Sequence, residues 1–140
     1  MNKTTHELLH ELKQRSSLQD FITENHDAFY SLEFKEYLNE LLCQKGLSKA
    51  EAISRAGLHQ TYAYQIFSGK KNPSRNKVLA LCFGMGLTIE ETQRTVTLAG
   101  VGALYPKVQR DSVILFALEK GFSLITCNEL LFDLQEEMLA

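Results

Sequence analysis

Apolar side chains recur every three or four positions along most of the chain, which is the spacing that predicts amphipathic helices. No run of alternating apolar and polar residues bounded by turn signals predicts a strand. We therefore expect an all-α fold. The predicted helices span about 6–15, 18–24, 32–44, 49–56, 60–67, 75–84, 89–99, 106–120 and 124–138.

Three junctions between these helices share one pattern: a glycine that can end a helix, an apolar residue directed into the core, and a hydroxyl that caps the next helix. They are Gly46-Leu47-Ser48, Gly86-Leu87-Thr88 and Gly121-Phe122-Ser123. Glu51 and Glu91 would complete capping boxes. Ser17 and Ser31 are the expected caps of helices 18–24 and 32–44, and Pro106 suits a first helical turn.

Residues 47–73 predict two short helices joined by a turn at Gly57 and followed by a corner at Gly69. Small residues on the first helix would let the next helix cross closely. The expected core positions are Ala52, Ile53, Ala56, Ala63, Ile66 and Phe67. This pattern leaves the outer side of helix 60–67 polar. Two helices joined in this way can place the second one in the major groove of DNA.

The charge distribution favours the same segment. Residues 45–77 hold seven basic residues and one acidic residue, a net charge of +6, although the whole chain carries –2. Residues 1–44 and 78–140 each hold four basic and eight acidic residues. Positive charge is thus concentrated where contacts to phosphate would be needed, although an ordinary solvated face is the alternative.

With this pattern of residues, the segment 47–73 resembles the lambda-repressor-like, Cro-type helix-turn-helix family, also called the XRE family. The resemblance rests on Ser48, Gly57, Ile66 and the Gly69-Lys70-Lys71-Asn72-Pro73 corner, and with the flanking helices it covers about 34–98. It implies a helix-turn-helix bundle that binds double-stranded DNA. Two departures are His59, in place of a hydroxyl cap, and Ala63, where a branched aliphatic residue is common.

The resemblance also implies roles for single residues. The positions expected to contact bases are Gln60, Thr61, Tyr64 and Gln65. The positions expected to contact phosphate are Lys49, Lys70, Lys71, Asn72 and Arg75, to which His59 adds a titratable group. Glutamine can pair with adenine and threonine can contact a thymine methyl group.

The resemblance predicts that the chain has three parts: a helical N-terminal arm (1–33), the Cro-type domain (34–100) and a helical C-terminal extension (101–140). The extension carries more apolar residues than a small helix-turn-helix body needs. We expect it to pack on the domain or on a partner. DNA readers of this kind usually pair across two half-sites, so a homodimer is expected.

Other functions are less consistent with the residues. His6-Glu7-Leu8-Leu9-His10 fits the zinc motif H-E-x-x-H, but the wider motif is missing and an amphipathic helix explains the leucines. We expect no metal, no cofactor and no enzymatic activity. Cys43, Cys82 and Cys127 should be reduced and largely buried. The longest apolar run, 78–87, is too short to span a membrane, and 1–15 has no apolar leader segment, so a cytoplasmic protein is expected.

The sequence therefore predicts a sequence-specific DNA-binding protein that regulates transcription and reads the major groove with helix 60–67. The alternative is a protein-interaction module, similar to an antitoxin or a signalling adaptor, with a degenerate helix-turn-helix. In that case the N- or C-terminal helices would bind the partner.

Overall fold

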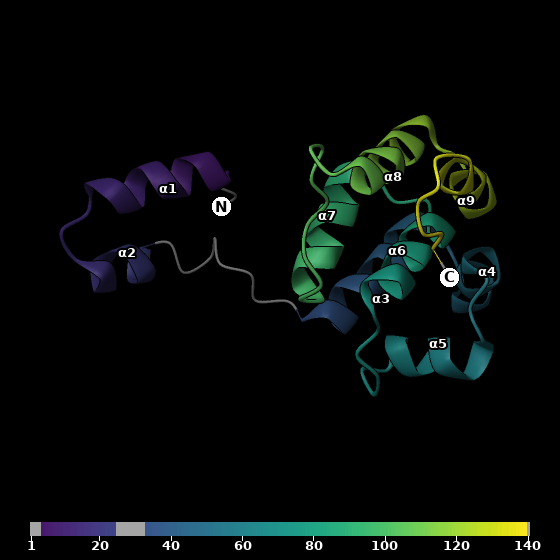
Figure 1. Cartoon of the computed structure of the whole chain (residues 1–140). Helices are drawn as coiled ribbons and strands as arrows, with labels where there is room; N and C mark the ends of the chain where they lie inside the picture. The colour runs from purple at the N-terminus through teal and green to yellow at the C-terminus, as the bar shows by residue number, and fades with distance from the viewer. Residues whose placement is uncertain (1–3, 25–32, 140) are drawn as a thin grey trace. The chain divides into compact units, whose positions relative to one another are not determined.

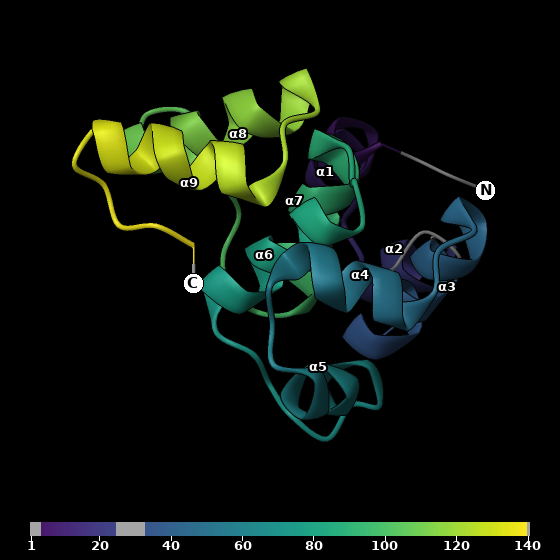
Figure 2. The ribbon, with the colours of Figure 1, turned by 90° about the vertical axis from the view of Figure 1, so that its right-hand side faces the viewer.

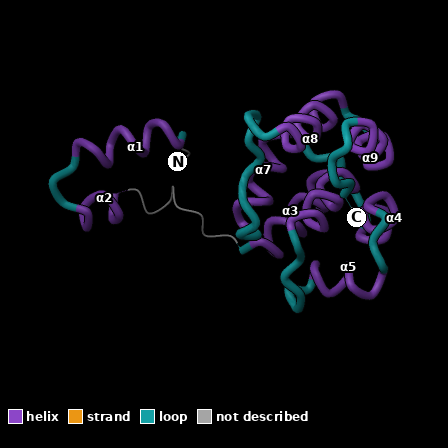
Figure 3. The backbone as a smooth tube through the Cα atoms, viewed as in Figure 1, coloured by secondary structure: helices purple, strands orange, loops and turns teal. Residues whose placement is uncertain are grey.

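The computed structural model describes residues 4–24 and 33–139, and every regular element within these ranges is a helix (Figures 1 and 3). This confirms the expected all-α class. The chain divides into two compact units, Met1–Leu32 and Glu33–Ala140. Each is described separately.

The first unit contains α1 (Thr5–Gln14) and α2 (Leu18–Glu24). The Ser17 hydroxyl accepts a hydrogen bond from the Asp20 amide at 3.3 Å, which confirms the predicted cap. Arg15, just after α1, forms ion pairs with Glu11 at 2.8 Å and with Glu24 on α2. These contacts join the ends of the two short helices.

The second unit is built around α6, whose residues from Val78 to Gly84 are all buried, as is Met85 after it. A helix that is apolar on every side belongs in the interior. The surrounding helices each bury one face against it or against one another. The helices of this unit are α3 (Phe34–Lys45), α4 (Lys49–Ala56), α5 (Gln60–Phe67), α6 (Arg75–Gly84), α7 (Ile89–Leu98), α8 (Gln109–Lys120) and α9 (Leu124–Asp133).

The closest approach to the small residues of α4 is made by α6, at Gly84. A Cβ atom on Gly84 would lie 2.4 Å from the Ala52 carbonyl oxygen and 2.9 Å from the Ala56 nitrogen. Backbone therefore meets backbone, and only glycine fits. The sequence predicted that the next helix, α5, would cross closely at these residues, but the close crossing is made by α6, two helices after α4.

The predicted junctions are confirmed in their backbone geometry. Gly46, Gly86 and Gly121 have φ values of 64°, 64° and 69°, and the Ser48–Glu51 and Thr88–Glu91 capping boxes are formed. The apolar step fails at Phe122, which is 36% exposed. Its ring packs edge-on against Phe116 at the surface, with centroids 6.0 Å apart, and Leu124 takes the buried place.

Three predicted helix ends were wrong. The helix predicted at 32–44 begins at Phe34, and the Glu33 amide donates to the Glu36 carboxylate at 3.4 Å; the expected cap, Ser31, lies outside the described residues. The helix predicted from Pro106 begins at Gln109, because residues 106–108 form a turn closed by a Val108 amide to Tyr105 carbonyl bond of 3.0 Å.

The last helix ends at Asp133 instead of near Met138. Gln135 adopts a left-handed conformation with φ of 59°, and the chain turns back. Asn128 then bonds the backbone of Leu139 twice, at 2.9 and 2.7 Å. Leu139 is buried, so the tail closes the core where the sequence predicted that the helix would continue to about Met138.

The prediction of three largely buried thiols was wrong for Cys43, which is exposed on α3; Cys82 and Cys127 are buried. Cys43 follows the buried pair Leu41 and Leu42 and falls on the solvent side of the helix. Burial raises the pKa of Cys82 to about 12 and that of Cys127 to about 11. Both buried thiols are therefore protonated near neutral pH.

The C-terminal helices belong to the same unit as the helices before them. α8 packs against α7, and α9 packs against α8 and α6 (Figure 2). Ile114, Ala117, Cys127 and Leu131 have no exposed surface. This part of the extension therefore packs within the chain.

Candidate nucleic-acid interface

The turn between α4 and α5 forms as predicted. Gly57 adopts φ of 64°, and its amide donates to the Ser54 carbonyl at 3.2 Å. All six predicted core residues of the pair are buried. Because the inner sides of both helices are buried, the opposite side of α5 is left to solvent.

That outer side carries the residues expected to contact bases. Gln60, Thr61 and Tyr64 are exposed, whereas Gln65 is half-buried. The amide and hydroxyl groups of the first two supply the donors and acceptors that match base edges. Their position on one helical face would let them enter a groove together.

The corner after α5 is held by backbone hydrogen bonds. The Gln65 carbonyl accepts from the Lys70 amide at 2.9 Å and from the Lys71 amide at 3.3 Å, and Gly69 adopts φ of 83°. Pro73 is buried and fixes the end of the corner. Lys70, Lys71 and Asn72 are consequently exposed on a defined loop.

The helix starts place two further candidates nearby. Lys49 is the first residue of α4, and its Nζ lies 5.9 Å from the centroid of the Phe67 ring at the end of α5. His59 is the N-cap of α5, and its exposed side chain makes no capping hydrogen bond. Both belong to the α4–α5 pair.

Arg75 differs from the other expected phosphate ligands, because its guanidinium has partners inside the protein. It pairs with both carboxylate oxygens of Asp111, at 3.0 and 3.1 Å, and donates to the carbonyls of Gly102 and Ala103 at 3.4 and 2.9 Å. Burial alone would raise the pKa of Asp111, but the bonds from Arg75 and from the Tyr105 amide lower it overall. Arg75 thus joins α6 to the loop before α8.

The basic surplus of residues 45–77 is smaller in the folded chain than in the sequence. Lys45 pairs with Glu91 of α7 at 2.9 Å, and Arg55 lies 3.8 Å from Glu51. With Arg75 paired as well, the remaining basic residues without a carboxylate partner among the described residues are Lys49, Lys70, Lys71 and Lys77. Three of these four are expected phosphate contacts.

Sequence reasoning missed Lys35 and Lys77. Lys35 is on α3, and together with Lys71 and Asn72 it lines a hollow of about 230 Å³ at the corner. Lys77 places its Nζ 5.8 Å from the centroid of the Tyr62 ring. Lys77 lies within the basic segment 45–77, so the sequence could have placed it among the expected phosphate contacts. Lys35 lies in an acidic stretch of the sequence, so only the fold reveals its position.

Other candidate features carry less. His6 and His10 are exposed on α1, and no three histidine, cysteine or acidic side chains gather into a metal site within residues 4–24 and 33–139. No helix in the described part of the chain is long and apolar enough to cross a membrane.

Comparison with known proteins gives one result. Residues 7–95 match a family model described as a helix-turn-helix domain, from near the start of α1 into α7. No match was found among curated proteins or among solved structures. Since the match covers well over half of a chain with the expected α4–turn–α5 geometry, the chain belongs to the helix-turn-helix domain family.

Proposed function

We propose that this chain is a sequence-specific, double-stranded DNA-binding protein of the Cro type that regulates transcription. The observation that carries this proposal is the exposed row of Gln60, Thr61 and Tyr64 on α5, flanked by lysines without carboxylate partners in the described residues. No acidic residue occurs between Ser54 and Pro73 to repel a phosphate backbone. α5 enters the major groove, and its outer side chains read base edges.

The proposed contacts divide by chemistry. Gln60, Thr61, Tyr64 and the half-buried Gln65 read bases, whereas Lys49, Lys70, Lys71, Asn72 and His59 bind phosphate. Arg75 is not among the proposed phosphate contacts, because four of its five guanidinium N–H donors bond groups within the protein. Phosphate contacts give affinity and position, and base contacts give discrimination. The proposal includes a cytoplasmic location and no enzymatic activity.

The test is selection from a random duplex library with the purified full chain. One enriched motif is expected, and its affinity should fall steeply with salt. With three to five phosphate contacts per chain, the slope of log K against log salt would be about –2.7 to –4.5 for each bound chain. Binding that is weak and equal for all duplexes would count against this function.

The second candidate function is a protein-interaction module. It is favoured by the large apolar side chains exposed on α9, far from the α5 reading face. The same library experiment separates the two candidates: an interaction module would enrich no motif, and replacing Gln60 would not change its activity. The +6 segment and the polar α5 face favour the DNA reader.

A further inference from the structure

One side of α9 is buried and the other is exposed to solvent. One side buries Cys127 and Leu131 in the core. The other exposes Ile125 (72% exposed) and Phe132 (68%), which line one hollow together with Met138 of the tail (44%). Isolated exposed apolar residues are ordinary, but neighbouring large ones mark interaction sites.

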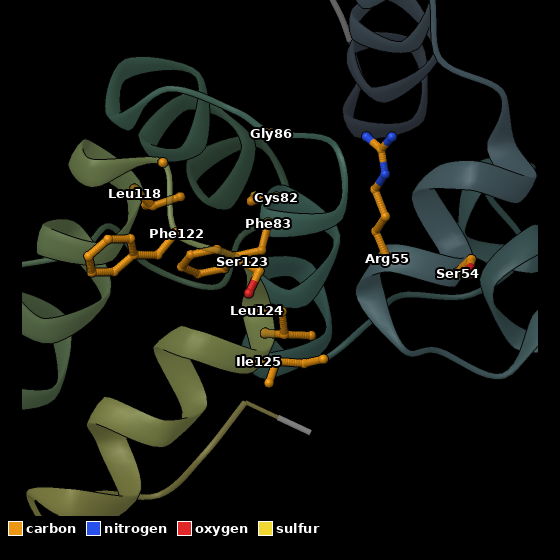
Figure 4. A pocket seen from close by; sticks show the side chains of 11 residues that line it. Ser54, Arg55, Cys82, Phe83, Gly86, Leu118, Phe122, Ser123, Leu124 and Ile125 are labelled. Carbon is orange, nitrogen blue, oxygen red and sulfur yellow. The ribbon is translucent and has the colours of Figure 1, made fainter.

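Ile125 stands between two hollows. The first, of about 410 Å³, lies between α4 and the start of α9; Phe83, Leu118, Phe122 and Leu124 line it, and Arg55 stands at its rim (Figure 4). The second, of about 440 Å³, is lined by Phe132 and Met138 and by the carboxylates of Glu129 and Asp133. Ile125 lines both. We call these two hollows and Ile125 the α9 surface.

The α9 surface has opposite charges at its two ends. The first hollow carries Arg55, whose nearest carboxylate is Glu51 at 3.8 Å. The second carries Glu129 and Asp133, neither of which has an ion-pair partner among the described residues. One end thus offers an apolar hollow with a cation, and the other a protruding aromatic ring with two anions.

We propose that a second copy of this chain covers the α9 surface through a two-fold axis near Ile125. A two-fold axis sets the first hollow of one copy against the second hollow of its partner. Phe132, about 10 Å along α9 from Ile125, then enters the apolar hollow opposite. Arg55 of each copy meets the acidic side chains of the other.

The exposed apolar area of the α9 surface is large enough for an interface with a second copy. At about 200 Å² for each large side chain, the exposed fractions of the apolar residues on the α9 surface correspond to roughly 440 Å² per copy. A standard interface takes about 800 Å² from each partner, of which a little over half is apolar. The residues counted are Phe122, Ile125, Phe132 and Met138.

The position of the surface leaves the proposed DNA contacts free. In two views at right angles, α8 and α9 lie at one end of the second unit and α5 lies at the other (Figures 1 and 2). Self-association is therefore compatible with DNA binding, and it does not depend on it. Each proposal can fail without the other.

The first experiment measures the oligomeric state of the full chain by sedimentation equilibrium. A Cys43→Ser background removes the exposed thiol, which could otherwise form disulfide-linked dimers. The wild-type surface should give a concentration-dependent dimer, and Ile125→Asp should give a monomer. Val108→Asp is the matched control, because Val108 is also an exposed apolar residue but lies outside the α9 surface; this variant should still dimerise.

The second experiment exchanges the charges. Arg55→Glu should weaken dimerisation about tenfold, because the axis doubles each charge contact. Combining it with Glu129→Arg and Asp133→Arg in the same chain should restore the wild-type dissociation constant. Circular dichroism and thermal melts of each variant check that the fold is intact, which is expected because all three side chains are exposed.

Several outcomes overturn the proposal. Weak specific association is detectable at a concentration on the order of 0.1 mM. A chain that is still monomeric at this concentration would show that a second copy does not bind the α9 surface. A folded Ile125→Asp variant that still dimerises would place the interface elsewhere. If the combined charge exchange does not restore the dimer affinity that Arg55→Glu loses, the proposed two-fold arrangement is excluded.

Discussion

At the scale of the residue, Gly84 sets how closely α4 and α6 approach. A methyl group there would lie within 3.0 Å of backbone and side-chain atoms of Ala52 and Ala56, and backbone atoms cannot rotate away. We expect Gly84→Ala to lower the free energy of unfolding by about 2–3 kcal/mol, although alanine favours helices. Urea denaturation monitored by circular dichroism measures this change.

The control for this change is Ser54→Ala, at an exposed position on α4. It should alter the free energy of unfolding by no more than about 0.5 kcal/mol. A Gly84→Ala variant as stable as the wild type would mean that the two helices separate easily. The close crossing would then be incidental to the fold.

The two classes of proposed DNA contact should respond differently to substitution. Gln60→Ala should relax preference at one base pair, at a cost of about 1–3 kcal/mol for the preferred site. Lys70→Ala with Lys71→Ala should weaken binding to all duplexes and reduce the salt slope by about two per chain, because two phosphate contacts are lost. Fluorescence anisotropy on the selected site and on scrambled duplexes measures both effects.

A matched loss of charge separates contact from general electrostatics. Lys107→Ala with Lys120→Ala removes two positive charges from α8 and the turn before it, outside the α4–α5 pair. This variant should keep the wild-type salt slope within about half a unit. Equal losses in both double variants would favour diffuse attraction over a defined phosphate site.

At the scale of the element, Asp111 joins α8 to α6 and to the loop between α7 and α8. It is buried, and it accepts from Arg75 and from the Tyr105 amide at 2.9 Å. Asp111→Asn keeps the shape but removes the charge, so Arg75 would lose its counterion. We expect the free energy of unfolding to fall by about 2–3 kcal/mol, as measured by urea denaturation.

The same contact predicts a pH dependence. The pKa of Asp111 is lowered in the folded chain, so its stabilising effect is present above the unfolded value near 4 and is lost as pH falls through the folded value. The difference in stability between wild type and Asp111→Asn should therefore be constant from about pH 8 to pH 5 and shrink below about pH 4. A difference unchanged at pH 2–3 would contradict this account.

Local rules predicted the helices whose ends are fixed by their own residues. Ser48, Thr88 and the glycines before them gave the right boundaries, because a cap bonds a backbone group only three positions away. The ends near Gln109 and Asp133 involve contacts outside the helices themselves. Asp111 accepts from the Tyr105 amide six residues before it, next to the turn that precedes Gln109, and Asn128 bonds the backbone of Leu139 eleven residues after it. Spacing within a helix gives no information about such contacts.

The candidate site shows the same limit. The outward positions of Gln60, Thr61 and Tyr64 followed from helical spacing, and the structure places them on an exposed face. The pairing of Arg75 with Asp111, 36 residues later, could not be seen in a local charge count. Formal charge in a segment therefore overstated the charge available to a phosphate.

At the scale of the whole molecule, the core is shared between the helix-turn-helix body and the C-terminal helices. Ile114, Ala117 and Leu131 have no exposed surface, and Arg75 depends on Asp111 for its ion pair. The sequence predicted residues 34–100 as a domain, and this remains a prediction. The burial suggests that those residues would not be stable without α8 and α9.

Truncation after Gly100 tests that inference. Exposing a buried Val, Leu or Ile side chain costs about 1.5–3 kcal/mol, so uncovering several of them approaches the 5–15 kcal/mol that stabilises a typical domain. We expect the chain ending at Gly100 to lose its cooperative urea transition, while the full-length Ile125→Asp variant keeps it. A truncated chain with a sigmoidal transition near the wild-type midpoint would instead show that residues 1–100 fold without α8 and α9. In that case α8 and α9 would serve association more than stability, because their burial would not be needed to hold α5 in place.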